Sequence, residues 1–503
     1  MVSIVGVFGS YSANRPSEMV KRMSDAIAHR GQERFTTLNQ ATSRKLSLIV
    51  RSPTTRDYHL EHTREHTFLV CSWCLDSDVI AEVMRSGSSL LDIDRPHAGR
   101  EAIDALILRF DQAGLTITRS KHSMNPMYYH WSEGNIAFST EKKALWSVGL
   151  SNVMELEPGQ VLRTGPRETQ SPVTTQEREY PEADKKRSRK DLLASLQSRL
   201  EESFRCLQGI ENIGVLFSGG VDSSLAALLA RKICRQVTLF TACSEGSHDS
   251  DSASAAAEAL DMELEIAPFD AEEAWQILPE VIYATETNRY ADIEIALPFF
   301  IASRAARNSG ISIMVSGQGP DELFAGYEKH VRLFMDRGEG ALDNELRSEI
   351  ENTNRVNIER DEKAIAYNGL SAFFPYLSSQ FVSEALTVPS RWKVTPGKNP
   401  ERKVIFRELA INMGLPKEIA LRPKKATQYS SGSQRIIRKA ISEKVRLVRK
   451  SEMKKGALEQ IVIDRIAQEL GMPTQGFSDV ELDFDLGPVR KLVQDIQRTS
   501  RQQ

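Results

Sequence analysis

The sequence predicts two successive domains, a strand-rich N-terminal domain and a C-terminal α/β domain built on a parallel sheet. From about residue 191 to 440, helical segments alternate with short apolar strands, which is typical of a parallel sheet covered by helices. One of these strands runs directly into a glycine-rich turn and a further helix. A polar stretch with prolines and mixed charges, residues 166–190, separates this region from residues 1–165 and indicates a linker.

Residues 1–165 combine strand patterns with one clear helical pattern. The run Ser3 to Gly9 is apolar and ends in glycine, as a buried strand would. Residues 17–29 carry Val20, Met23 and Ile27 at helical spacing, and short β-like runs follow. This mixture indicates an α+β domain.

In the C-terminal region we expect strands at 214–217, 237–242, 264–267 and 311–315, preceded by a helix at 192–207. Ligands of parallel sheets bind at the carboxyl ends of the strands, so the loops after these strands are the candidate site. Residues 441–503 form a charged helical extension with apolar stripes, which we interpret as packing helices.

The composition is that of an ordinary globular protein. The chain has 503 residues, 40% of them hydrophobic and 26% charged, and a formal net charge of −3, which gives no electrostatic reason to expect nucleic-acid or membrane partners. The N-terminus has no signal-peptide pattern, and no apolar run reaches membrane-spanning length. Five cysteines, an odd number, favour a reducing cytoplasm. Cys71 and Cys74 have redox spacing but no second pair nearby, which favours structural cysteines.

The stretch Ser218-Gly-Gly-Val-Asp-Ser-Ser224 is predicted to bind phosphate. Its glycines let a ligand approach the backbone, its hydroxyls converge, and the N–H groups of the following helix face the turn. The spacing matches neither a Walker loop nor a dinucleotide fingerprint. The alternative is an ordinary serine- and glycine-rich turn that caps a helix.

A second loop of similar character follows the apolar strand that ends near Val315. It reads Ser316-Gly-Gln-Gly-Pro-Asp-Glu322 and exposes backbone while adding carboxylates. Asp222 and Asp321 would together suit Mg²⁺ on a pyrophosphate, because Mg²⁺ takes few carboxylates and completes its shell with phosphate and water. The alternative is a helix N-terminus at which acids are favoured by the dipole.

The first loop resembles the pyrophosphate loop of the ATP pyrophosphatase superfamily, whose fold is adenine nucleotide α-hydrolase-like. Together with the Ser316 loop and the stretch from Arg360-Asp-Glu-Lys-Ala to Phe374-Pro-Tyr-Leu, it resembles the synthetase domain of glutamine-hydrolysing asparagine synthetases. The same architecture serves β-lactam and carbapenam synthetases and lasso-peptide cyclases.

The N-terminal region is similar to a class II glutaminase, an Ntn-type sandwich. The similarity lies in His29-Arg-Gly-Gln-Glu, Asn125-Pro-Met-Tyr-Tyr and Phe138-Ser-Thr-Glu-Lys-Lys-Ala-Leu. The family places a nucleophilic cysteine where this chain has Val2, and its Asn-Gly oxyanion segment is replaced by Cys71 to Asp76. The resemblance therefore implies a glutaminase-like domain that has lost glutamine hydrolysis.

The resemblance also implies roles for individual residues. Lys424 would be the cation over the charge that develops during catalysis, with Gln318 and Asp222 as further catalytic residues. Asp222 and Asp321 would hold Mg²⁺, and Glu294, Gln318 and Glu322 would line the substrate pocket. The residues expected to bind ATP are Leu216, Ser218, Gly219, Gly220, Asp222, Ser223, Ser224, Ala242, Ser316 and Gly317.

The implied activity is ATP-dependent activation of a small carboxylate, with release of pyrophosphate and AMP, followed by amide formation with an amine or ammonia. That would place the protein in cytoplasmic asparagine biosynthesis, with a separate ammonia source and with a homodimer left open. Gln318 and Glu294 stand where the family has a glutamate and an arginine, which favours an alternative, an amide or lactam ligase for another acid. A second alternative is a non-catalytic paralogue that binds ATP and a protein partner. An RNA-thiolating enzyme ranks last, because the cysteines are scattered and the charge is slightly acidic.

Overall fold

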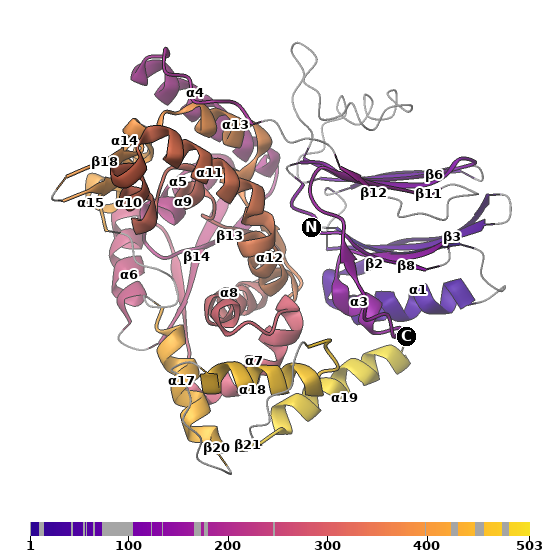
Figure 1. Ribbon diagram of the computed structural model, residues 1–503. Helices are drawn as coiled ribbons and strands as arrows, with labels where there is room; N and C mark the ends of the chain where they lie inside the picture. The colour runs from indigo at the N-terminus through magenta and orange to yellow at the C-terminus, as the bar shows by residue number, and fades with distance from the viewer. Residues whose placement is uncertain are drawn as a thin grey trace. The chain divides into compact units, whose positions relative to one another are not determined.

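The computed structural model (Figure 1) describes the chain apart from residues 1, 10–14, 42–43, 54–55, 57, 64–65, 73–103, 122, 133, 165–172, 176–179, 245–246, 398, 424–430, 448–456, 475–481 and 503. The described residues form two compact units. The sandwich unit comprises residues 1–178, 271–293 and 437–503, and the parallel-sheet unit comprises residues 179–270 and 294–436. An α/β chain in two units is confirmed, but segments 271–293 and 437–503 group with the N-terminal residues.

Within the described residues, two six-stranded antiparallel sheets form the sandwich unit, with strand orders β10-β8-β9-β1-β3-β2 and β12-β11-β7-β6-β5-β4. The first sheet contains β1 (Ser3–Gly9), β2 (Gln32–Ala41), β3 (Arg44–Ser52), β8 (Tyr128–Ser132), β9 (Asn135–Ser139) and β10 (Met154–Glu155). The second contains β4 (Tyr58–His62), β5 (Thr67–Cys71), β6 (Leu106–Asp111), β7 (Gly114–Arg119), β11 (Gln160–Thr164) and β12 (Val173–Thr175). Strand β12 lies within the expected linker, where it pairs with β11.

The alternation of side chains along β1 explains why the first sheet is buried on both faces. Ile4 and Phe8 belong to the core shared by the two sheets, whereas Val5 and Val7 pack with residues of α1 (Arg15–Ala26) and α3 (Lys142–Trp146). A short 3₁₀ turn, η1 (Ala28–Arg30), follows α1. The unit is thus a sandwich with helices on one outer face.

The C-terminal helices also belong to the sandwich unit. Helices α18 (Ala457–Glu469) and α19 (Gly487–Gln502) pack on α7 (Ala271–Thr285), and α19 also contacts α1. A small sheet of β20 (Val445–Leu447) and β21 (Leu482–Phe484) brings Phe484 against Trp275 of α7, with ring centroids 5.9 Å apart. No helix among the described residues has the length and apolar character needed to cross a membrane.

In the described part of the parallel-sheet unit, the central sheet has five strands in the order β15-β14-β13-β16-β17, and all neighbouring strands are parallel. The strands are β13 (Asn212–Leu216), β14 (Gln236–Cys243), β15 (Leu264–Pro268), β16 (Ile313–Val315) and β17 (Ser371–Phe373). The first four confirm the sequence prediction. Strand β17 was not expected.

Helices surround this sheet (Figure 1). They are α4 (Arg189–Phe204), α5 (Val221–Ile233), α6 (His248–Leu260), α8 (Tyr290–Asn308), α9 (Pro320–Leu323), α10 (Glu328–Arg337), α11 (Glu339–Thr353), α12 (Glu359–Ala366), α13 (Ser379–Thr387), α14 (Val404–Asn412) and α15 (Lys417–Ala420). Helix α17 (Ser433–Lys444) begins in this unit, and most of its residues belong to the sandwich unit. Shorter elements are the 3₁₀ turns η2 (Arg205–Leu207), η4 (Pro375–Leu377) and η5 (Ser390–Trp392), the π-helical turn η3 (Asn354–Ile358), and the hairpin of β18 (Val394–Thr395) and β19 (Glu401–Arg402).

The strand order places a topological switch point between β13 and β16. From β13 the chain moves outward to β14 and β15, and later returns on the other side of β13 to form β16 and then β17. The loops after β13 and β16 therefore diverge and leave a crevice at the carboxyl ends of the strands, which is where open α/β sheets bind their ligands.

Candidate functional site

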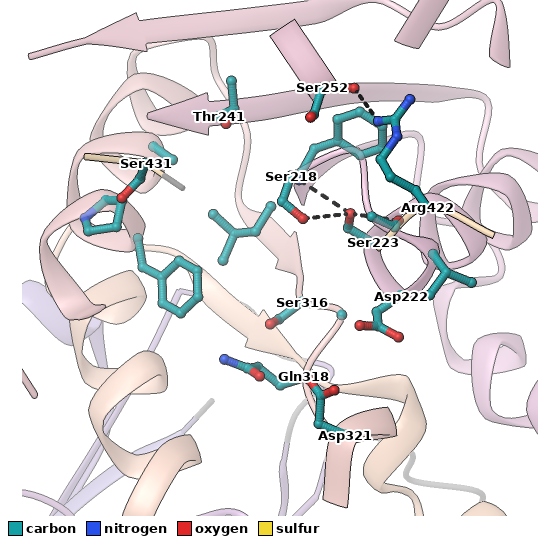
Figure 2. Close-up of a pocket in the computed structure, with 18 of the residues that line it drawn as sticks. Ser218, Asp222, Ser223, Thr241, Ser252, Ser316, Gln318, Asp321, Arg422 and Ser431 are labelled. Carbon is teal, nitrogen blue, oxygen red and sulfur yellow. Dashed lines mark hydrogen bonds between the residues drawn. The ribbon is translucent and has the colours of Figure 1, made fainter. Parts of the chain in front are cut away.

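A pocket lies at this switch point in the parallel-sheet unit. Residues after β13 line it, namely Phe217, Ser218 and Gly220 to Ser223, together with Ser316 to Gln318 after β16. Helix α8 contributes Pro298, Phe299 and Ala302. Figure 2 shows Ser218 and Ser223 facing the same space as Ser316 and Gln318. The two loops singled out in the sequence thus form one site.

The first loop is held by hydrogen bonds among its own residues. The Ser223 hydroxyl accepts from the Ser218 backbone N–H at 3.2 Å, donates to the Gly220 carbonyl at 3.3 Å, and lies 3.3 Å from the Ser218 hydroxyl. Helix α5 begins immediately afterwards at Val221. Several hydroxyls and the N-terminus of a 13-residue helix therefore face one pocket, which suits a phosphate group.

Gly219 is required by its backbone conformation and by its surroundings. Its φ is +70°, and a Cβ there would lie 2.3 Å from the Ser252 carbonyl oxygen. Arg422 ties these two segments together, because its Nη1 donates to the carbonyls of Gly219 and Ser252 at 2.9 and 2.8 Å. These contacts tie the loop to the neighbouring helix α6.

Gly317 allows the two loops to meet. A Cβ at this position would lie 2.9 Å from the Ser223 backbone nitrogen, so any larger residue would push the β16 loop away from α5. Leu216, Ala242 and Ser316 also line the pocket, and their assignment to the adenosine end stays a prediction. Gly219 and Ser224 belong to the loop without lining the pocket, and Ser224 is fully buried in the first turn of α5.

Two carboxylates and a buried lysine meet on one side of the pocket. Lys403 Nζ lies 2.8 and 2.7 Å from the two carboxylate oxygens of Asp222, and 2.7 Å from Asp321 Oδ1. Burial lowers the pKa of Lys403, and the charge of Asp222 opposes that shift. Since one cation already reaches both carboxylates, their placement fits a shared Mg²⁺ ion.

Gln318 is oriented by a buried carboxylate behind it. Its Nε2 donates to Asp361 Oδ2 at 2.7 Å, and Arg360 Nε donates to the other oxygen of Asp361 at 2.7 Å. Asp361 is fully buried. Only the amide nitrogen can donate to a carboxylate, so this contact fixes which end of the Gln318 amide is left as an acceptor.

The other expected pocket residues have different surroundings. The Glu322 carboxylate accepts from Tyr327 Oη at 2.5 Å and Asn357 Nδ2 at 3.0 Å, and burial raises its pKa. Glu294 accepts from Gln434 Nε2 at 3.0 Å. Neither residue is among the described residues that line the pocket. Lys424 lies outside the described residues.

The comparisons with known proteins place this geometry in a family. The model of the family described as asparagine synthase matches residues 195–338 and 334–478, together more than half of the chain. The chain belongs to the asparagine synthase family. A putative glutamine-hydrolysing asparagine synthetase of Methanocaldococcus jannaschii is 30% identical over 64% of this chain and 68% of that protein.

Two further relatives of the asparagine synthase family match a smaller share of their own length. The asparagine synthetase of Sandersonia aurantiaca is 30% identical over 44% of this chain and 43% of that protein. The probable asparagine synthetase of Acanthamoeba polyphaga mimivirus is 28% identical over 64% of this chain and 62% of that protein. Against these two relatives, the match spans less than two thirds of the known protein.

Val2 stands at the position where the resemblance to class II glutaminases places the nucleophile. Val2 is 2% exposed and packs in the core between the two sheets, with neighbours such as Ile4 and Leu48. Most of the expected oxyanion segment, residues 73–76, lies outside the described residues, as does Cys74. Cys71 is buried in the same core.

The glutaminase-like motifs meet in a buried charge cluster instead. Glu141 forms ion pairs with Arg30 and Lys143 and lies 3.0 Å from His29 Nε2. Arg30, Lys143 and His29 hold the pKa of this fully buried carboxyl well below its usual value, against the opposing effect of burial. Burial lowers the pKa of His29. The motif that contains Arg30 and the motif that contains Glu141, 111 residues later in the sequence, therefore meet in one buried contact.

Sequence reasoning missed four residues of the site: Lys403, Arg407, Asp361 and Tyr376. The Tyr376 hydroxyl donates to the Asp222 backbone carbonyl at 2.8 Å. Lys403 and Arg407 both line the pocket; Lys403 is the N-cap residue of α14, and Arg407 follows four residues later within the helix. A pair of cations at that spacing before an apolar helix was the available signal.

Proposed function

We propose that this protein activates a small carboxylate with ATP, releases pyrophosphate, and joins the acyl group to an amine or ammonia, without a glutaminase activity of its own. The observation that carries the proposal is the convergence of the Ser218–Ser224 loop with Asp222 and Asp321 at the switch point of the sheet. Membership of the asparagine synthase family supports it.

Each group in the pocket has a part in the binding of ATP. The hydroxyls of Ser218 and Ser223 and the N-terminus of α5 would receive the pyrophosphate end. Leu216, Ala242 and the Ser316-Gly317 backbone would contact the adenosine. Asp222 and Asp321 would hold Mg²⁺, which neutralises charge on the phosphates when it is bound.

In the first step, a carboxylate oxygen of the substrate attacks the α-phosphorus of ATP. A new P–O bond forms while the bond to the β-phosphate oxygen breaks, and pyrophosphate leaves as acyl-adenylate forms. Negative charge accumulates on the departing pyrophosphate, and Lys403, Arg407 and the α5 N-terminus are placed to stabilise it. Lys424 remains a proposed further cation.

In the second step, an amine attacks the acyl carbon, AMP leaves, and the amine loses a proton. Gln318 presents an amide oxygen as an acceptor because Asp361 holds its nitrogen. An amide orients an N–H group but does not take its proton as a carboxylate would. The amine must therefore arrive as the free base, or lose its proton to solvent or to the departing phosphate.

The proposal excludes glutamine as a nitrogen donor through this chain alone. A buried valine at position 2 provides neither a thiolate nor a hydroxyl. Ammonia or another amine must reach the acyl-adenylate from outside the sandwich unit, and the identity of the acid is left to experiment.

The test is exchange of labelled pyrophosphate into ATP, with Mg²⁺ present and aspartate compared against a panel of other carboxylates. Asp222→Ala should abolish the exchange, whereas Asp251→Asn, a change at an exposed position on α6, should preserve it. Exchange with aspartate assigns asparagine synthesis, and exchange with another acid assigns a different amide ligase. No exchange with any acid, together with no AMP release, would contradict the proposal and favour an ATP-binding paralogue.

A further inference from the structure

Lys403 makes a set of contacts that matches the donor number of a lysine. An ammonium has three N–H donors. Three oxygens lie within 2.8 Å of Lys403 Nζ, both carboxylate oxygens of Asp222 and one of Asp321. The side chain is 2% exposed, so solvent contributes little to its stabilisation. The lysine is therefore bound as a cation between two carboxylates.

The backbone conformation around Lys403 directs its side chain toward Asp222 and Asp321. Its φ is +58°, an uncommon conformation for a residue with a Cβ, and it stands at the N-cap of α14. Gly326 clears the space on the other side, because a Cβ there would lie 1.7 Å from Asp321 Oδ1 and 2.6 Å from Lys403 Cε. The uncommon φ of Lys403 and the absence of a side chain at Gly326 both allow the contact between Lys403 and Asp321.

The three oxygens that bind Lys403 are also the ones that would ligate Mg²⁺. A magnesium ion binds carboxylate oxygen at about 2.1 Å, closer than the ammonium does. Both cations on the same oxygens would face one another across a few ångströms inside a buried pocket, where repulsion is poorly screened. The ammonium and a divalent ion are thus alternatives at this position.

Nucleotide phosphates change the charge balance between the carboxylates, the Lys403 ammonium and a divalent ion. Without them, two carboxylates are matched against one ammonium, and adding a divalent ion leaves an excess of positive charge. The anionic phosphates of ATP supply new acceptors for Lys403 and free both carboxylates. Lys403 lines the same pocket as the phosphate loop, so its nitrogen stays on the ligand side after the exchange.

We propose that Lys403 is an internal counter-ion that keeps divalent cations off Asp222 and Asp321 until nucleotide phosphates receive its ammonium. Metal then enters the site together with ATP rather than before it. This inference rests on the proposed function, since it assumes that the pocket binds ATP.

The experiment measures Mn²⁺ binding to the full chain by electron paramagnetic resonance, in which bound Mn²⁺ loses the signal of the free ion. Wild type, Lys403→Met and Lys363→Met are compared without nucleotide. Lys363 is the matched control, because it is also buried, pairs with Glu359 at 2.6 Å and does not line the described pocket. Binding of α,β-methylene-ATP with Mn²⁺ is measured in parallel by calorimetry.

We expect Lys403→Met to bind Mn²⁺ without nucleotide at least about tenfold more tightly than wild type, in the range of ordinary coupling between ligands. Lys363→Met should behave like wild type. The inference is overturned if Lys403→Met binds nucleotide-free Mn²⁺ no more tightly than wild type.

A measurement on the wild type alone protects the test against a variant that does not fold. Tight nucleotide-free binding of Mn²⁺ that is lost in Asp222→Asn would overturn the inference while leaving the proposed function intact. Failure of wild type to bind the ATP analogue would instead overturn the proposed function, and with it this inference.

Discussion

The two units each contain a lysine that is almost completely buried between carboxylates, but the two lysines have different partners. Lys143 in the sandwich unit contacts Glu141, lies 3.6 Å from Glu286 and donates to the Ala284 carbonyl at 3.1 Å. Lys403 in the parallel-sheet unit forms ion pairs with Asp222 and Asp321 and lines the pocket. The first lysine is satisfied by protein groups that fix the fold, whereas the second faces the space into which a ligand enters.

Two buried ion pairs of the same chemistry can therefore have different roles. Replacing one partner of such a pair is costly in either place, because a charge is left buried without its counterpart. The two clusters differ in whether a ligand can reach them. Lys403, Asp222 and Asp321 line the pocket, so a bound ligand can replace one of their mutual contacts. Substitutions in each cluster should therefore affect different properties.

Asp222→Asn should give the largest loss of activity. We expect pyrophosphate exchange to fall about 10²- to 10³-fold, the range for removing one charge-stabilising group from an active site. Thermal unfolding measured in parallel should show a folded protein. Exchange at the wild-type rate would contradict this prediction, because the cluster of Lys403, Asp222 and Asp321 would then be structural, like the cluster around Glu141.

Glu141→Gln should affect stability and leave the chemistry of the pocket unchanged. Removal of its charge leaves Arg30 and Lys143 buried without their partner, which typically costs about 3–5 kcal/mol. Denaturant unfolding should show this loss, while pyrophosphate exchange per folded molecule stays within about twofold. A matching drop in exchange would mean that the sandwich cluster acts on the reaction.

The stability of the folded protein should depend on pH through the Glu141 carboxyl group. The pKa of Glu141 is lowered well below 4.5 in the folded protein, so its contribution is present above the unfolded-state value and is lost as the pH falls through the folded pKa. Wild type should lose stability below about pH 4.5 more steeply than Glu141→Gln. Unfolding curves at several acid pH values provide the measurement, and parallel slopes would contradict it.

Gln318→Glu tests the orientation of the amide in the pocket. The new carboxylate would stand against buried Asp361, and we expect amide formation to fall about 10- to 100-fold through like-charge repulsion. The double variant Gln318→Glu with Asp361→Asn exchanges donor and acceptor and should recover part of the loss. The KM for ammonia should move more than the KM for ATP, and equal changes would speak for a general structural effect.

Val2→Cys should have the smallest effect. A cysteine of similar size in this core should change stability by less than about 1.5 kcal/mol. We expect no release of glutamate from glutamine, because the thiol would remain packed among apolar side chains. Measurable glutaminase activity would show that the sandwich unit retains the rest of a catalytic site.

The sequence was most informative where structure is local. The strand, turn and helix around Ser218 follow from consecutive residues, and β13 and α5 appear where that pattern placed them. Strand β17 was not predicted from the sequence because it has three residues and pairs along one edge with β16. Such a strand has too few residues to show a period of its own.

Long-range contacts account for the parts of the site that sequence did not reveal. Lys403 reaches Asp222 across 181 positions of sequence, and Asp361 reaches Gln318 across 43. Neither contact follows from the local pattern around either residue. The assignment of Glu294 to the substrate pocket, made by similarity, stays a prediction; its carboxylate accepts from Gln434 Nε2.

The chain passes from one unit to the other four times, after residues 178, 270, 293 and 436. Neither unit is therefore one continuous segment that can be gained or lost by a single deletion. A cut at the linker would separate α1 from α19, and would leave α7, α18 and α19 without the N-terminal residues of their own unit. The C-terminal residues 437–503 therefore need the N-terminal residues 1–178 to complete their unit, whatever chemistry the sandwich performs.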